Sequence, residues 1–376
     1  MSEISSGLNK STFYYIKQFW FLIDKRRRYQ TLVFCFLSLI NGLAELSSFS
    51  ALIVILNLIV NPKAINNLKL FTFISSFPIG INENNFQFFI LISFIVFLFI
   101  ATSLKILNVF LCSRFGAVLG NEFSSKIFNY FINEDYQINL YKNSSNTITT
   151  IINYCDDTVV GIVSIFLLIA NIINAFFIGF LVFLYDPKIS LCIIVLFSCT
   201  YLLIGNKVRF ALFENDKIAQ IYIKKRIKHI QESISNLREI ILSSIQDLYY
   251  KEYKKLDKKS RIQRVKNIVI SYTPKYIVEF IGLILIACIG VFFINSSKTT
   301  NEIIITLGVF AIGAQKLLPL FQQSYVYWSQ FKGVSYSLNE IILTLKNVKN
   351  KNKKLTDFQF NNKLSKEIIE FNKLDI

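Results

Sequence analysis

The sequence predicts an all-α integral membrane protein with six long transmembrane helices that continue as helices outside the bilayer. The 376 residues are 53% hydrophobic and 17% charged, with a mean hydropathy of +0.46, whereas soluble domains carry about 25% charged residues. Six apolar stretches reach the length of about 18 residues that a membrane-spanning helix needs. No stretch alternates polar and apolar residues as barrel strands do, which argues against a β-barrel.

The six apolar stretches define the predicted spans. Polar and charged residues separate them, and the third and fourth are separated only by Asp186, Pro187 and Lys188. Gly and Pro are scarce in the chain, at 13 and 5 of 376 residues, which favours long uninterrupted helices. The predicted spans are 29–60, 86–112, 159–185, 189–205, 272–294 and 303–328.

The Lys and Arg residues lie mostly on one side of the predicted membrane. Of 41, the segments 1–28, 113–158, 206–267 and 329–376 hold 34, and the opposite connections at 61–85, 186–188 and 295–302 hold four. Basic residues collect on the cytoplasmic side, so both termini are expected in the cytoplasm. Because these residues flank the spans, we expect contact with membrane lipid and no nucleic-acid partner, despite the net charge of +17.

The connection at 206–267 is expected to be helical. Its apolar residues recur at helical spacing, for example at Ile227, Ile230 and Ile234. Two antiparallel arms of about 25 residues would project roughly 35–40 Å from the membrane. The connection at 113–158 can form a similar, shorter hairpin.

This architecture and several local stretches resemble the transmembrane domain of ABC exporters with six long helices per subunit. NEDYQINLYKNSSNTITTIINYCDD at 133–157 is similar to the first inner loop of that family, and LREIILSSIQDLYYKEY at 237–253 to the second, with Asn236 where Gly is usual. SYTPKYIVEF at 271–280 and AIGAQKLLPLFQQSYVYW at 311–328 look like segments of a subgroup that flips lipid-linked oligosaccharides. The resemblance covers roughly residues 15–376.

The resemblance implies a cytoplasmic segment at 1–28, a transmembrane domain at 29–345, and a linker with the start of an ATP-binding domain at 346–376. It also implies residence in a bacterial inner (plasma) membrane. The sequence contains no G-x-x-x-x-G-K-[ST] loop to hold ATP phosphates. We therefore expect no ATP hydrolysis, cofactor or metal in this chain. ATP and Mg²⁺ are expected in an ATPase domain or subunit elsewhere, and a second, identical transmembrane half in a homodimer.

In ABC exporters the inner-loop turns are coupling helices that dock into the ATPase domain and transmit its closure. Transferred to this sequence, that role falls on residues of both inner loops. The alternative is that these turns are ordinary helix–loop–helix tips. The coupling candidates are Asp135, Tyr136, Tyr141, Asn143, Arg238, Glu239, Gln246 and Asp247.

Four charged residues within or beside the predicted spans are candidates for the substrate cavity, because intramembrane charges are costly and usually face a cavity or a partner. They are Lys316, Lys105, Lys275 and Glu45. The lysines can hold a phosphate or pyrophosphate headgroup as ammonium point charges. The alternative is that Lys316 pairs with Glu45, and that Lys105 and Lys275 extend to the membrane surface.

The predicted function is therefore that of the membrane-spanning subunit of an exporter or flippase. It would move an amphipathic or lipid-linked substrate, such as a lipid-linked glycan, by alternating access. A peptide, another lipid or a drug is an alternative substrate on the same fold. A second alternative is a non-transporting regulatory membrane subunit or an inactive truncated product. An intramembrane enzyme is disfavoured because the spans contain no paired carboxylates and no nucleophile–base pair.

Overall fold

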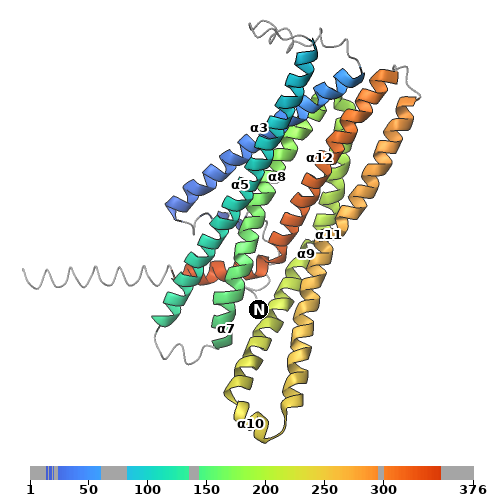
Figure 1. The fold of residues 1–376 in the computed structure, drawn as a ribbon. Coiled ribbons are helices and arrows are strands. Elements are labelled where there is room, and N and C mark those ends of the chain that lie inside the picture. Colours follow the sequence, from blue (N-terminus) through green and yellow to red (C-terminus); the bar gives the residue numbers. More distant parts are fainter. Residues whose placement is uncertain are drawn as a thin grey trace, which may run out of the picture.

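A computed structural model describes residues 24–60, 83–134, 144–294 and 300–348, together with a few residues between 14 and 20. Within these ranges all regular secondary structure is helical (Figure 1). The predicted all-α fold class is therefore confirmed.

Among the described residues, six long helices form the bundle, and each contains one predicted span. Each also has an 18-residue window with a mean hydropathy between 1.3 and 2.5. A 30 Å hydrocarbon core needs about 20 helical residues, so all six helices continue beyond it. The chain is a multi-pass membrane protein. The helices are α3 (Lys25–Val60), α5 (Glu83–Ile132), α8 (Cys155–Tyr185), α9 (Pro187–Ser235), α11 (Gln246–Ile294) and α12 (Thr300–Gly333).

Shorter helices complete the described chain. A π-helical turn, η2 (Thr150–Tyr154), joins α7 (Ser144–Thr149) to α8 without a break. After Gly333, residues 335–348 form a further helix. A sharp connection joins α8 to α9, where the backbone N–H of Lys188 donates to the Asp186 carboxylate at 3.2 Å, and Pro187 opens the new helix, a position that proline favours.

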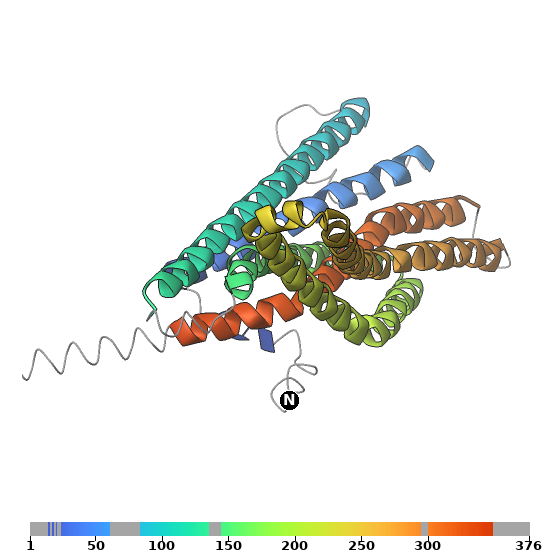
Figure 2. The ribbon, with the colours of Figure 1, turned by 90° about the horizontal axis from the view of Figure 1, so that it is seen from below.

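The helices α9 and α11 pack along each other as a long antiparallel pair and extend past the other helices (Figures 1 and 2). We call their extension at 206–267 the arm, and the corresponding end of the bundle the arm end. The short helix α10 (Leu237–Leu242) forms the tip. The chain reverses at Ser244, which has a φ of 55°. The predicted helical hairpin at 206–267 is thus present.

Among the described residues, three buried apolar clusters hold the bundle together, and the two larger ones lie toward different ends of it. One lies toward the arm end and includes Phe34, Phe115 and Tyr154; the other lies toward the opposite end and includes Phe49 and Val182. Between Phe34 and Phe49 the buried residues of α3 are mostly polar: Ser38, Asn41, Glu45 and Ser48, together with Gly42 and Ala44. The clusters therefore leave a polar layer between them, where the candidate site lies.

Candidate substrate cavity

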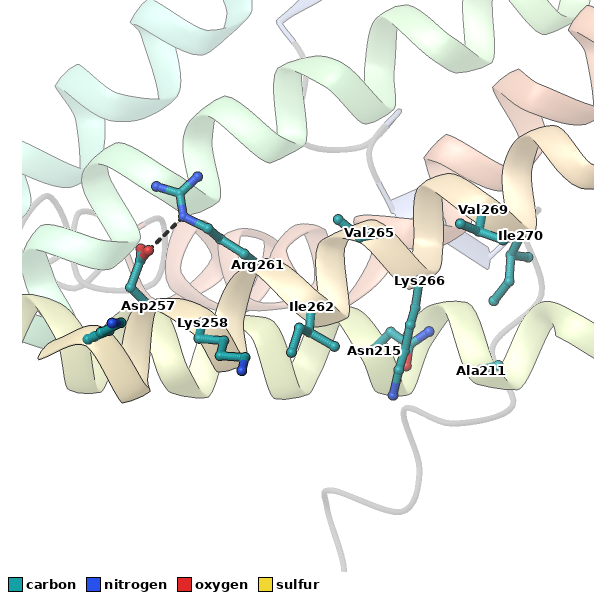
Figure 3. Close-up of a pocket in the computed structure, with 11 residues that line it drawn as sticks. Ala211, Asn215, Asp257, Lys258, Arg261, Ile262, Val265, Lys266, Val269 and Ile270 are labelled. Carbon is teal, nitrogen blue, oxygen red and sulfur yellow. Dashed lines mark hydrogen bonds and ion pairs between the residues drawn. The ribbon is translucent and has the colours of Figure 1, made fainter. Parts of the chain in front are cut away.

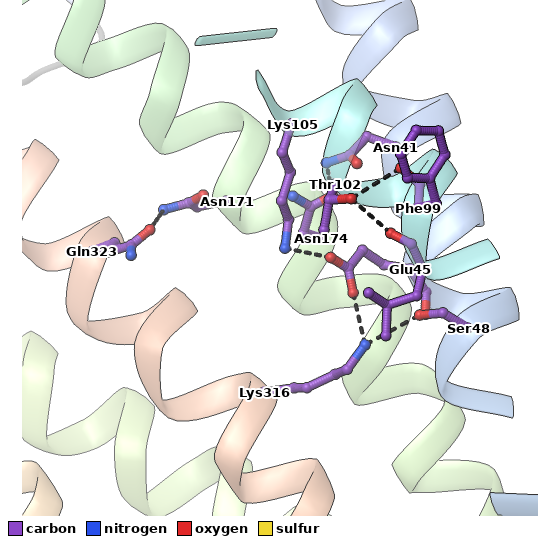
Figure 4. Close-up of polar contacts among 11 residues, drawn as sticks. Asn41, Glu45, Ser48, Phe99, Thr102, Lys105, Asn171, Asn174, Lys316 and Gln323 are labelled. Carbon is purple, nitrogen blue, oxygen red and sulfur yellow. Dashed lines mark hydrogen bonds and ion pairs between the residues drawn. The ribbon is translucent and has the colours of Figure 1, made fainter. Parts of the chain in front are cut away.

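A cavity of about 450 Å³ lies in this polar layer. Residues of α3, α5, α8 and α12 line it, so four of the six spans meet there (Figure 4). Three of the four sequence-predicted cavity residues, Glu45, Lys105 and Lys316, line it.

Glu45 joins the charged groups of the cavity. Its side chain on α3 is 6% exposed. One carboxylate oxygen, Oε1, forms an ion pair with Lys105 of α5, and the other, Oε2, accepts a hydrogen bond of 2.9 Å from Lys316 of α12. Lys316 also donates to the Ser48 hydroxyl at 3.1 Å. The Lys316–Glu45 pair that the sequence left as an alternative is present, and Lys105 joins it.

These three side chains carry one more positive charge than negative charge. The Glu45 carboxylate is buried, whereas the side chains of Lys316 and Lys105 are 26% and 44% exposed. Both ammonium groups therefore keep a face toward the cavity. A single carboxylate balances only one of them, and an intramembrane charge without a partner is costly. The arrangement favours the entry of an anion.

Amide side chains line another part of the cavity, beside apolar residues such as Leu98 and Val109. Asn41 donates to Asn174 at 3.2 Å, and Asn171 donates to Gln323 at 3.3 Å. Next to them, Asn108 donates to the Ser38 hydroxyl at 3.0 Å. The buried Oδ1 atoms of Asn41 and Asn108 have no hydrogen-bond partner within the part of the chain that the structure describes. They can accept a hydrogen bond from a ligand hydroxyl or from water.

The sequence reasoning did not single out these amides as cavity residues. The available signal was an Asn within an otherwise apolar stretch, at positions such as Asn108 and Asn174. Sequence spacing alone does not show that such residues from different spans meet at one depth. Lys275, the fourth predicted cavity residue, lies on an exposed face of α11 and is not part of the lining. Its role stays a prediction.

The predicted coupling residues Arg238, Glu239, Gln246 and Asp247 are all exposed at the tip of the arm. Large apolar side chains accompany them and are also exposed: Leu237 at 55%, Leu242 at 73% and Leu248 at 64%. The other four coupling candidates, Asp135, Tyr136, Tyr141 and Asn143, lie outside the described residues. The coupling role itself stays a prediction.

A second hollow of about 820 Å³ lies on the side of the arm (Figure 3). Apolar residues such as Ile262 and Val265 form its floor, and basic side chains surround it, among them Lys258 and Lys266. Asp257 pairs with Arg261 at 2.7 Å at one end. The sequence had indicated only that the arm is basic and amphipathic.

Comparison with known proteins identifies the fold. No protein-family model and no curated protein matches the sequence. Among solved structures, the chain is similar to a bacterial Atm1-family ABC exporter with ATP bound, with a TM-score of 0.63 and 12% sequence identity. The match covers 86% of this chain and 54% of the exporter chain, so this chain spans about half the length of that protein. At this identity the similarity shows the fold alone: six membrane-length helices arranged as in the transmembrane domain of an ABC exporter.

Proposed function

We propose that this chain is the transmembrane part of an ATP-driven exporter that moves an amphipathic molecule with an anionic headgroup by alternating access. The cavity formed by Glu45, Lys105 and Lys316 is the observation that supports the proposal. It lies among four spans, and it contains one more ammonium group than carboxylate. An anionic headgroup would restore charge balance without breaking either existing ion pair.

A headgroup that also carries hydroxyls suits the remainder of the lining. The amides of Asn171 and Gln323 offer both donors and acceptors, and the unpartnered oxygens of Asn41 and Asn108 need donors. Sugar hydroxyls donate and accept in the same way. Within the anionic class we therefore propose a lipid-linked glycan, whose phosphate or pyrophosphate would meet the two lysines.

The energy source is proposed to be an ATPase domain or subunit docked at the arm tip. At the tip, Leu237, Leu242 and Leu248 are 55–73% exposed. This region lies beyond the predicted spans and therefore away from lipid. An exposed apolar patch of this kind is typical of a protein interface. A second transmembrane half, most simply another copy of this chain, would complete the pathway, and the basic arm would face the cytoplasm of a bacterium.

Headgroup recognition is tested with a short-chain polyprenyl phosphate and the matching uncharged polyprenol, each added to the protein in nanodiscs. We expect the phosphate to raise the thermal unfolding temperature more than the alcohol does. Lys316→Ala should abolish this difference. The matched control is Lys188→Ala, which removes an exposed lysine outside the spans and should keep it. If polyprenyl phosphate and polyprenol stabilise the unmodified chain equally, the proposal of an anionic headgroup is contradicted.

The ATPase partnership is tested by purifying the tagged protein from native membranes and assaying ATP hydrolysis. We expect a co-purified ATPase, and we expect Leu242→Glu at the tip to lose it. Lys255→Gln, an exposed change higher on the arm, should retain it. Absence of any ATPase from the unmodified chain would instead favour the non-transporting regulatory subunit.

A further inference from the structure

A second buried cluster of charged residues lies in the arm-end half of the bundle, away from the cavity. It brings together four helices: Asp157 of α8, Asp216 and Gln220 of α9, Arg264 of α11, and Ser337 of the helix at 335–348. Asp216 lies eleven residues beyond the span that ends at 205, which corresponds to about 16 Å along the helix. Asp157 and Arg264 precede the predicted spans that begin at 159 and 272, and Ser337 follows the one that ends at 328. The cluster therefore lies outside the predicted membrane-spanning segments.

The two carboxylates share the same hydrogen-bond donors. The Gln220 amide nitrogen donates to Asp157 at 2.5 Å and to Asp216 at 3.4 Å. Ser337 donates through its hydroxyl to Asp157 at 3.2 Å and through its backbone N–H to Asp216 at 3.3 Å. One residue of the helix at 335–348 thus contacts both carboxylates. These contacts act together with apolar packing, because Leu338, Ile341, Ile342 and Leu345 of this helix are also buried.

The charge balance of this cluster is unfavourable when both carboxylates are ionised. Asp216 is 6% exposed and the Asp157 side chain is 18% exposed. In the described part of the chain, the cation within ion-pair distance is Arg264, 3.9 Å from Asp157 and itself 51% exposed. The other titratable groups nearby on the packed elements are Asp156, Tyr154, Lys224, Tyr336 and Glu340.

Burial and, secondarily, the neighbouring Asp157 carboxylate raise the pKa of Asp216 to about 8. Two carboxylates that share one buried site cannot both ionise cheaply, which is the general reason for such a shift. Burial also raises the pKa of Asp157, although Arg264 opposes the change. The pair is therefore expected to retain one proton at neutral pH.

We propose that Asp157 and Asp216 form a proton-binding site, and that the bound proton holds the helix at 335–348 against α8 and α9. With one proton present, the site carries one negative charge, which Arg264 balances. Without it, two anions are buried side by side. The Ser337 donors favour the ionised carboxylates, but burial outweighs them, and burial is relieved when water reaches the site as the helix at 335–348 moves away.

Two further features fit a proton at this site. The Gln220 Oε1 atom is buried and has no hydrogen-bond partner among the described residues. Rotation of its amide group would present this acceptor to a protonated carboxyl. In addition, the π-helical turn η2 ends three residues before Asp157. A π turn inserts an extra residue, which changes the direction in which later side chains point, and such turns are frequent at functional sites.

The direction of the pH effect follows from the raised pKa. While the helix at 335–348 is packed against α8 and α9, Asp216 retains its proton at a pH at which an exposed aspartate, with a pKa near 3.9, has lost it. Opening therefore releases a proton, and the contact weakens as pH rises toward 8. For one proton, the equilibrium constant for opening rises about tenfold between pH 6 and pH 7, and by a smaller factor as the pH approaches 8. The effect requires no substrate, so its test is separate from tests of transport.

Hydrogen–deuterium exchange of the full chain in nanodiscs tests the proposal. After correction for the pH dependence of intrinsic exchange, amides of the helix at 335–348 should open at least about tenfold more at pH 8 than at pH 6. Amides in the buried part of α12 serve as the internal reference and should not change. Asp216→Asn, which cannot ionise, should keep the helix protected at both pH values.

The matched control is Asp257→Asn, which removes a carboxylate of the arm that pairs with Arg226 and Arg261 and not with the helix at 335–348. It should retain the pH response of the unmodified chain. An unmodified chain whose helix at 335–348 shows the same corrected protection at both pH values would overturn the proposal, even if Asp216→Asn failed to fold. A pH response that persists in a folded Asp216→Asn protein would overturn it as well.

Discussion

The cavity cluster and the arm-end cluster have opposite charge balances. Around Glu45, two ammonium groups share one carboxylate, and an open cavity of about 450 Å³ adjoins them. Around Asp216, two carboxylates share one half-exposed guanidinium, and the surrounding donors are tightly packed. The cavity cluster lacks one negative charge, and the arm-end cluster lacks one positive charge. The first has room for an anion of molecular size, whereas the second has room for a proton.

This difference suggests a division of roles along the bundle. A cluster beside a cavity can obtain its missing charge from a charged group of a bound ligand. A cluster closed by four helices can change its charge only by protonation, and its state then acts on the helices that close it. The predictions below test whether the clusters differ in this way.

The largest effect is expected for Glu45→Ala. This change leaves Lys105 and Lys316 without their shared carboxylate inside the membrane. Removing one partner of a buried ion pair costs about 3–5 kcal/mol, so we expect a loss of this size in the free energy of unfolding. Chemical unfolding in detergent micelles measures it. Glu232→Ala, which disrupts an exposed pair with Lys228, should cost about 0.5 kcal/mol or less. Equal losses in the two variants would show that the cavity cluster is not buried in the folded protein.

The sequence predicted one of these clusters better than the other. Glu45 and Lys316 are visible because an ionisable residue inside an apolar stretch is rare, and their pairing was one of two stated alternatives. Asp157 and Asp216 are not visible in this way, because they lie in polar, helical connections where acidic residues are common. Their proximity depends on the pairing of α9 with α8 and on the return of the chain after Gly333, which no periodicity specifies.

The same contrast holds for the fold. Apolar length predicted six spans, and helical spacing predicted the arm, because both signals are local in the sequence. The π-helical turn before Asp157 and the helix at 335–348 were not predicted as separate elements. They depend on tertiary contacts, which a single sequence does not reveal.

The second-largest effect is expected at the contact between α5 and α8. Helix α5 carries Lys105 of the cavity cluster, and α8 carries Asp157 of the arm-end cluster. A Cβ atom added at Gly116 would lie 2.5 Å from a methyl group of Val163, whereas one added at Gly290 would meet nothing within 4 Å. Gly116→Ala should therefore destabilise the protein by about 1–3 kcal/mol through overpacking. Gly290→Ala should be neutral or slightly stabilising, since alanine favours helices.

Gly116→Ala also tests whether the clusters depend on each other. If the contact between α5 and α8 positions both clusters, this change should reduce both the response to polyprenyl phosphate and the pH response of the helix at 335–348. Loss of only one response would show that the two clusters are supported independently.

The third effect is a change in the pH dependence of stability. Because the pKa of Asp216 is raised in the folded protein, folding binds a proton that the unfolded chain has already lost above pH 4. The free energy of unfolding should fall by about 2 kcal/mol between pH 6 and pH 8. Asp216→Asn should remove this part of the pH dependence, as measured by chemical unfolding at both pH values. An unchanged slope would mean that Asp216 is ionised throughout this range.

The smallest change in stability is expected for Lys105→Met, and it tests the charge argument for the cavity directly. The Lys105 side chain is 44% exposed, and Glu45 keeps its second partner, Lys316. The free energy of unfolding should therefore change by about 1 kcal/mol or less. The cluster nevertheless becomes neutral, so its affinity for polyprenyl phosphate should fall by about tenfold, which corresponds to about 1.4 kcal/mol. If the affinity for polyprenyl phosphate does not change in this variant, the role of Lys105 is structural only. In that case the excess positive charge would not be what selects the ligand, and the lining amides would remain as the basis of recognition.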